Sequence, residues 1–287
     1  MRILVFGKNG QVARALKQTS ADVICVGRDE ADLLQSGAAR LAIEKHQPDV
    51  VVNAAAYTAV DKAETEAEAA SRLNAEAPAE MAKAAAARHS PFIHISTDYV
   101  FDGAAGGRLS EDSATNPINQ YGATKLAGER AVMQAHADAV VLRTSWVFSE
   151  FGANFVKTML RLGAERNELN IVADQIGGPT AASDIAAAIL IIAGKKHRGA
   201  PGAGIYHFQG SPPVSWAEFA EKIFDIAGSS VKVSHIKTED YPTPARRPKN
   251  TTLDCARIER EFGIAQPDWR ASLRRTLSAL NNEGQDQ

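Results

Sequence analysis

The feature that most constrains the fold is a regular alternation of short apolar segments with longer helical ones. Helix-forming composition fills residues 11–18, 38–46, 61–88 and 121–136. Between these stretches, apolar runs typical of buried parallel strands are expected at residues 2–6, 23–26, 50–52, 92–95 and 140–143. The alternation predicts an α/β fold with a doubly wound parallel sheet, which binds ligands beyond the carboxyl ends of its strands.

The pattern changes near residue 150, where proline and glycine become frequent and the helical stretches shorten. We expect residues 1–150 to form mainly the sheet domain and residues 151–287 mainly a smaller C-terminal lobe. Parts of about 174–200 and 247–255 should return to the sheet domain. Within the lobe, residues 216–227 predict an amphipathic helix, with Ser215 as its N-cap and Gly228 after its end.

The composition argues against several classes of partner. Lysine and arginine number 32 and aspartate and glutamate 34, so the net charge of −2 gives no support to a nucleic-acid or membrane surface. Cys25 and Cys255 are far apart in sequence, which fits a reducing compartment. The histidines form no metal-ligand cluster, and we find no signal peptide or membrane-spanning run. We expect a cytoplasmic protein without a bound metal.

A glycine turn follows the first expected strand and opens a helix at Gln11 and Val12. Gly7 allows a tight turn there, and Gly10 lets the backbone approach a pyrophosphate next to the N–H groups of the helix. A plain strand-to-helix turn would need only one glycine. The two glycines in this context therefore favour a dinucleotide-binding, Rossmann-type domain.

The end of the second strand indicates which dinucleotide. An acidic residue there would bind the ribose 2′-hydroxyl, whereas Arg28 can bind a 2′-phosphate. NADPH is therefore favoured, although the nearby Asp29 and Glu30 leave NADH open as a second cofactor.

Asp32 and Leu33 could cover the adenine edge, or could instead begin the next helix. The third strand is followed by three small residues, Ala54, Ala55 and Ala56. Their side chains either leave room for the cofactor to lie across the end of the strand or serve only for tight packing.

Tyr121 and Lys125 form the strongest candidate for chemistry. Their i, i+4 spacing puts both side chains on one face of a helix. A phenol is a poor proton donor at neutral pH until a cation stabilises its phenolate, and Lys125 is placed to do that. The hydroxyl of Thr97, at the end of the fourth strand, could complete a proton-transfer site.

These residues stand within longer motifs that run through most of the chain. On those motifs it resembles the extended short-chain dehydrogenase/reductases, and most closely their dTDP-4-dehydrorhamnose reductase branch. The motifs are FGKNGQV (6–12), NAAAYTAVDKAE (53–64), STDYVFDG (96–103), YGATKLAGE (121–129), RTSWVF (143–148), DQIGGPT (174–180) and RPKN (247–250).

The resemblance implies hydride transfer to the 4-keto group of a dTDP-4-dehydro-6-deoxy-L-sugar, giving dTDP-L-rhamnose. Tyr121 would act as general acid, Lys125 would lower the phenol pKa and bind the nicotinamide ribose, and Thr97 would hold the ketone oxygen. The C-terminal lobe would bind the substrate. The residues implied to contact it are Thr58, Val60, Thr97, Asp98, Tyr99, Trp146 and Arg247.

Two of these residues also have plain structural interpretations. Trp146 could be core packing after a strand. Arg247, whose guanidinium would bind the diphosphate, could instead be a loop charge. The first helix lacks the glutamate with which some relatives bind a metal at a dimer interface, so we expect neither that metal nor that dimer. A monomer or another homodimer stays open.

Three other functions are considered for a chain with these motifs. A 4,6-dehydratase is disfavoured because Thr97 is followed by Asp98 and Tyr99 rather than by an Asp–Glu pair. Another 4-ketosugar reductase or an epimerase would keep Tyr121 and Lys125. A non-catalytic regulatory subunit of the methionine adenosyltransferase type is a third possibility.

Overall fold

The computed structural model describes residues 1–283 and is built on one parallel six-stranded sheet. Its strand order is β10-β5-β4-β3-β1-β2. This order confirms the predicted doubly wound sheet, with its topological switch point between β1 and β3. The strands are β1 (Arg2–Phe6), β2 (Asp22–Val26), β3 (Val50–Asn53), β4 (Phe92–Thr97), β5 (Val140–Thr144) and β10 (Gly204–His207).

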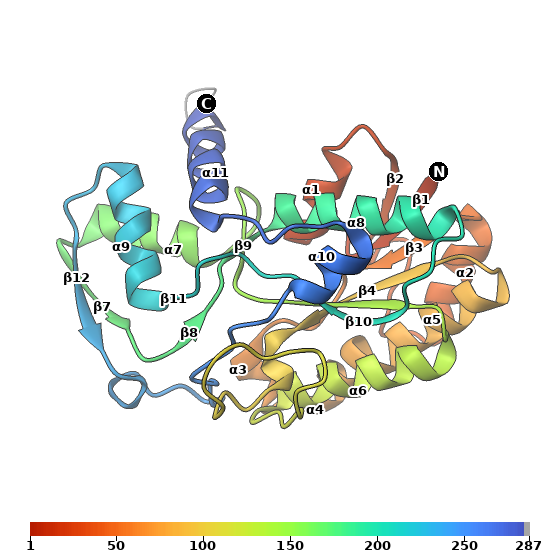
Figure 1. Cartoon of the computed structure of the whole chain (residues 1–287), viewed down its shortest axis with the longest axis horizontal. Helices are drawn as coiled ribbons and strands as arrows, with labels where there is room; N and C mark the ends of the chain where they lie inside the picture. Colours follow the sequence, from red (N-terminus) through yellow and green to blue (C-terminus); the bar gives the residue numbers. More distant parts are fainter. Residues whose placement is uncertain (284–287) are drawn as a thin grey trace.

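Helices cover both faces of the sheet, as Figure 1 shows. Alternate residues of β1 point to opposite faces, so Ile3 and Val5 join one apolar core and Leu4 and Phe6 join the other. The first core contains α1 (Gln11–Lys17), α8 (Ala182–His197) and α10 (Ala256–Phe262). The second contains α2 (Ala38–His46), α5 (Ala77–Ala87) and part of α6 (Gln120–Ala135).

A smaller lobe with its own apolar core lies beside the sheet domain (Figure 1). It contains α7 (Phe155–Glu165), α9 (Trp216–Ala227), α11 (Trp269–Glu283) and the parallel pair β7 (Glu168–Val172) and β12 (Lys232–Ile236). Short strand pairs join the two parts: β6 (Val147–Phe148) with β9 (Thr180–Ala181), and β8 (Ile176–Gly177) with β11 (Val214–Ser215). The chain returns to the sheet domain through α8 and β10. A 3₁₀ turn, η2 (Asp98–Val100), follows β4, and another, η3 (Thr238–Asp240), follows β12.

The helix of the small lobe that the sequence predicts at residues 216–227 is confirmed with the same bounds. The Ser215 side chain accepts from the Glu218 N–H, and the Glu218 carboxylate accepts from the Ser215 N–H. Gly228 ends the helix in a left-handed conformation, with φ of 68°. Both end signals are local, which is why the sequence locates them well.

The stretch of helical composition at residues 61–88 is mostly helical in the structure, but it is divided into several pieces. The structure has α3 (Val60–Ala63), α4 (Ala67–Ser71), a π-helical turn η1 (Arg72–Glu76) and then α5. Pro78 lacks an N–H and cannot bond to the Asn74 carbonyl four residues earlier, which favours the wider turn. The Asn74 side chain meanwhile accepts from the Tyr57 N–H at 2.8 Å and donates to the Tyr57 carbonyl at 3.1 Å. The wider turn therefore anchors the loop that follows β3.

Candidate functional site

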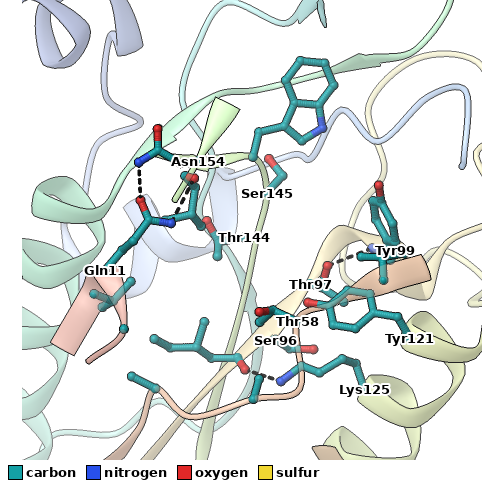
Figure 2. A pocket seen from close by; sticks show the side chains of 18 of the residues that line it. Gln11, Thr58, Ser96, Thr97, Tyr99, Tyr121, Lys125, Thr144, Ser145 and Asn154 are labelled. Atoms are coloured by element: carbon teal, nitrogen blue, oxygen red, sulfur yellow. Dashed lines mark hydrogen bonds between the residues drawn. The ribbon is translucent and has the colours of Figure 1, made fainter. Parts of the chain in front are cut away.

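A cavity of about 540 Å³ lies at the carboxyl ends of the sheet strands. Its walls come from the glycine loop, the ends of β3, β4 and β5, the first turns of α6, and the small lobe. Figure 2 shows Tyr121, Lys125, Thr97 and Tyr99 together on one side and Gln11 and Asn154 on the other. The switch-point rule predicts a ligand site at this edge of the sheet.

Helix α6 carries Tyr121 and Lys125 in its first two turns. Asn119 caps it, because its side chain accepts from the Gly122 N–H at 2.8 Å. Gly122 faces the Tyr99 carbonyl so closely that a Cβ there would clash with it. The Tyr121 ring meets the Tyr99 ring edge to face, with 5.6 Å between the centroids. A cap and a small residue therefore hold the start of α6 against the turn that follows β4.

Tyr121 carries its proton at neutral pH. Burial raises the pKa of the Tyr121 phenol to about 12, although the nearby Thr97 hydroxyl acts in the opposite direction. The Thr97 hydroxyl donates to an Asp98 carboxylate oxygen at 3.0 Å and accepts from the Tyr99 N–H at 3.2 Å. Thr97 thus has a fixed orientation next to the phenol.

Lys125 is almost wholly enclosed, with 2% of its surface exposed. Its Nζ donates to the Ile95 carbonyl at 2.7 Å and lies 3.5 Å from His94 Nε2. Burial lowers the pKa of Lys125 to about 8, although the Glu129 carboxylate acts to raise it. Burial and the Lys125 charge hold the pKa of His94 well below its usual range, so the imidazole is neutral.

Asp98 is the most perturbed carboxyl group in the cavity wall. Burial raises its pKa to about 6, in spite of the hydrogen bond that it accepts from Thr97. Thr144, at the end of β5, also lines the cavity, and within residues 1–283 its buried hydroxyl has no hydrogen-bond partner. A buried hydroxyl without a partner is costly, so Thr144 is suited to bond a polar ligand.

The glycine loop fits a dinucleotide. Gly7 has a φ of 104°, and a Cβ on it would lie 2.9 Å from the Ala54 backbone, so only glycine is accommodated. A Cβ on Gly10 would lie 3.2 Å from the Gly7 carbonyl. The expected cofactor residues that line the cavity are Gly10, Gln11, Val12, Ala54, Ala55, Ala56, Tyr121 and Lys125.

Four other expected contacts lie elsewhere. Gly7, Arg28, Asp32 and Leu33 are not among the residues that line the cavity in the described part of the chain. The Arg28 side chain is 73% exposed and lies 3.8 Å from the Asp32 carboxylate, whereas Leu33 is buried in the second core. The exposed guanidinium of Arg28 is thus accessible to a ligand that extends past β2.

The expected substrate residues divide in the same way. Thr58, Val60, Thr97, Asp98, Tyr99 and Trp146 line the main cavity. Arg247 instead lines a neighbouring cavity of about 410 Å³. Its guanidinium makes a two-pronged ion pair with the Asp61 carboxylate, at 2.9 and 2.8 Å.

The structure also shows contacts that the sequence did not indicate. The Gln11 side-chain oxygen accepts from Ser149 at 2.7 Å and from Asn154 at 3.0 Å, as the dashed lines in Figure 2 show for the Asn154 bond. The glycine loop is thereby tied to the N-cap of α7 in the small lobe. Trp216, at the start of α9, lines the cavity opposite the sheet. Neither contact has a local signal, because the partners are far apart in sequence.

Comparison with known proteins assigns the chain to a family. Residues 1–282 match the family model described as RmlD substrate binding domain. A dTDP-4-dehydrorhamnose reductase of Sinorhizobium fredii is 46% identical over 295 residues, covering 100% of both chains. The chain belongs to the dTDP-4-dehydrorhamnose reductase family. The resemblance drawn from the motifs is therefore confirmed.

Solved structures of this reductase family share the fold. The crystal structure of a member from Clostridium acetobutylicum aligns with a TM-score of 0.92 at 36% identity, covering 98% of this chain and 100% of that one. A member from Bacillus anthracis, solved in complex with NADP, gives a TM-score of 0.91 at 35% identity and covers 97% and 99%.

Residues 1–283 contain no group of three or more His, Cys, Asp or Glu side chains placed to hold a metal ion. None of their helices combines the length and the apolar character needed to cross a membrane.

Proposed function

We propose that this protein uses NADPH to reduce the 4-keto group of a dTDP-4-dehydro-6-deoxy-L-sugar, giving dTDP-L-rhamnose. This proposal rests on one observation. Thr97, Tyr121 and Lys125 line a single cavity, and residues of the glycine loop line the same cavity. The relatives at full-length coverage are named as reductases of this kind, and one of them was solved with NADP.

The protein's part in the reaction is to hold the ketone and to deliver a proton. Tyr121 is protonated at neutral pH and donates to the carbonyl oxygen as negative charge develops on it. Thr97, held by Asp98 and the Tyr99 N–H, orients that oxygen. The Lys125 ammonium stabilises the phenolate that the proton leaves behind.

The cofactor supplies the hydride, and the glycine loop is suited to bind its pyrophosphate. Gly7 and Gly10 provide close backbone approach, and the three alanines 54–56 leave room across the end of β3. The exposed guanidinium of Arg28 is suited to a 2′-phosphate, which supports NADPH with NADH as a weaker alternative.

The sugar would lie between the sheet domain and the small lobe. Residues that line the cavity would surround it: Thr58, Val60, Asp98, Tyr99 and Trp146. Arg247 would bind the diphosphate from the neighbouring cavity, since a guanidinium forks onto phosphate oxygens. In this arrangement, residues 1–150 bind mainly the cofactor and the later lobe binds mainly the sugar nucleotide.

The test is to supply dTDP-4-dehydro-L-rhamnose and follow the absorbance of NADPH and, separately, of NADH. We expect faster oxidation of NADPH and a product two hydrogens heavier than the ketosugar. Tyr121→Phe serves as the matched control, because it removes the proton donor while retaining the ring. Failure to oxidise either cofactor would overturn the proposal.

The proposed setting is the cytoplasm, with the protein acting as a monomer or homodimer on a nucleotide sugar. The free thiols of Cys25 and Cys255 support a reducing compartment. Light scattering of the purified protein, with and without NADPH, measures the oligomeric state. A tetramer or larger assembly would contradict it.

A further inference from the structure

Two tryptophans from different parts of the chain stack face to face in the wall of the main cavity. Trp146 follows β5, and Trp216 begins α9 in the small lobe. Their ring centroids lie 3.5 Å apart and their planes differ by 6°. Both side chains line the cavity that contains Tyr121 and Thr97. The pair therefore links the lobe to the reaction site directly.

The backbone of Trp146 is in an unfavourable conformation. Its φ of 46° lies in the left-handed region, which non-glycine residues rarely adopt. Such a conformation persists only where the surroundings fix it. The Trp146 carbonyl accepts from the Thr180 N–H at 3.2 Å, and its indole lies so close to Gly177 that a Cβ there would be 2.7 Å from Cε2. One contact surface of Trp146 is thus provided by β8.

Trp216 is held from three directions. The capping box of Ser215 and Glu218 fixes the start of α9. The strand just before it pairs with β8, with Ser215 opposite Ile176. The Phe155 ring packs against the Trp216 indole, with 4.5 Å between centroids. Trp216 is therefore a rigid support, placed by the same strand β8 that supports Trp146.

We propose that Trp216 is a positioning residue for the sugar nucleotide: its indole holds that of Trp146 in the orientation that packs against the pyranose ring. This inference rests on the proposed function for the identity of the ligand. It assigns to Trp216 no contact with the reacting atoms. The stack stays intact when the sugar binds, so the small lobe sets the geometry of the sugar site through one aromatic contact.

A spectroscopic experiment tests the stack without any need for activity. Two indoles stacked at this distance couple their electronic transitions and give a couplet in the circular dichroism spectrum. The chain has three tryptophans, and Trp269, which packs on Phe219 in the lobe core, serves as the control. We expect Trp216→Phe and Trp146→Phe to abolish the couplet and Trp269→Phe to retain it. A couplet that survives Trp216→Phe, or that disappears when the ketosugar is added to the wild type, overturns the proposal.

Kinetics then test the consequence for the sugar. Loss of an aromatic pair of this kind corresponds to about a ten-fold change in an equilibrium constant. We expect Trp216→Ala to raise KM for the ketosugar by about that factor, with KM for NADPH unchanged. Trp216→Phe should recover part of the loss, and it keeps the test valid if the alanine variant does not fold. An unchanged KM for the ketosugar in Trp216→Phe, with the couplet gone, would refute the positioning role. Inactive wild-type protein with an intact couplet would instead count against the proposed function alone.

Discussion

A buried ion pair behind the site gives the sharpest quantitative prediction. The Arg143 guanidinium on β5 donates to both Glu129 oxygens, at 2.9 and 2.7 Å, and both side chains are 2% exposed. Ser96, next to Thr97, donates to the same carboxylate at 2.5 Å. Glu129 follows Lys125 by one helical turn on α6. Glu129→Gln preserves the shape of the side chain and removes its charge.

The structure predicts two effects of this change, one on stability and one on the pKa of Lys125. Breaking one side of a buried pair leaves an uncompensated charge, which costs about 3–5 kcal/mol of unfolding free energy. In a chain of this size that corresponds to a fall in Tm of roughly 10 °C. The Glu129 charge also acts to raise the pKa of Lys125, so in the variant burial acts unopposed and this pKa falls below about 8. The activity of Glu129→Gln should therefore decline at a lower pH than that of the wild type.

Urea unfolding followed by circular dichroism measures the first effect, and pH profiles of kcat/KM measure the second. Glu76→Gln is the matched control, because Glu76 lies 3.6 Å from Arg72 but is 60% exposed. An exposed pair contributes about 0–1 kcal/mol. Replacing both partners by apolar residues, as in Glu129→Leu with Arg143→Met, should restore most of the stability. If Glu129→Gln lowers the free energy of unfolding by no more than Glu76→Gln does, the buried ion pair does not stabilise the fold as we expect.

Three further predictions concern the reaction. Tyr121→Phe should lower kcat by about 10²–10⁴-fold, as expected for loss of a general acid, while NADPH affinity measured by fluorescence titration stays unchanged. In the wild type, Lys125 is protonated below its pKa of about 8 and loses its charge above that pKa. We therefore expect kcat/KM to fall as pH rises through about 8. A kcat/KM that still rises at that pH would contradict the role of Lys125. Arg28→Glu should raise KM for NADPH but not for NADH, measured with the same ketosugar, since a carboxylate repels the 2′-phosphate.

The sheet and α9 could be predicted from sequence because their signals are local. Apolar runs of strand length mark the sheet, and Ser215, Glu218 and Gly228 mark the ends of α9. The π-helical turn could not be predicted, because it depends on contacts between Asn74 and Tyr57. The sequence motifs predict a common site for Thr97, Tyr121 and Lys125. In the structure the three residues line one cavity.

The contacts between the sheet domain and the small lobe could not be predicted from the sequence. The sequence indicates Gln11 only for its place in the glycine loop, whereas its side chain bonds Ser149 and Asn154 in the structure. It indicates Trp216 only as the first residue of an amphipathic helix, whereas the Trp216 ring stacks on Trp146. Each depends on how the lobe sits against the sheet, which no local pattern encodes.

The two perturbed groups of α6 imply an order of events for the proton. With the pKa of Tyr121 at about 12 and that of Lys125 at about 8, the phenol holds its proton more tightly than the ammonium does. The resting site at neutral pH therefore carries both protons, which suits reduction. Once Tyr121 has donated, its phenolate charge favours the ammonium form and raises the pKa of Lys125. Burial thus lowers the pKa of Lys125 in the resting site. During the reaction the same burial strengthens the attraction between the ammonium and the phenolate, since little water screens it.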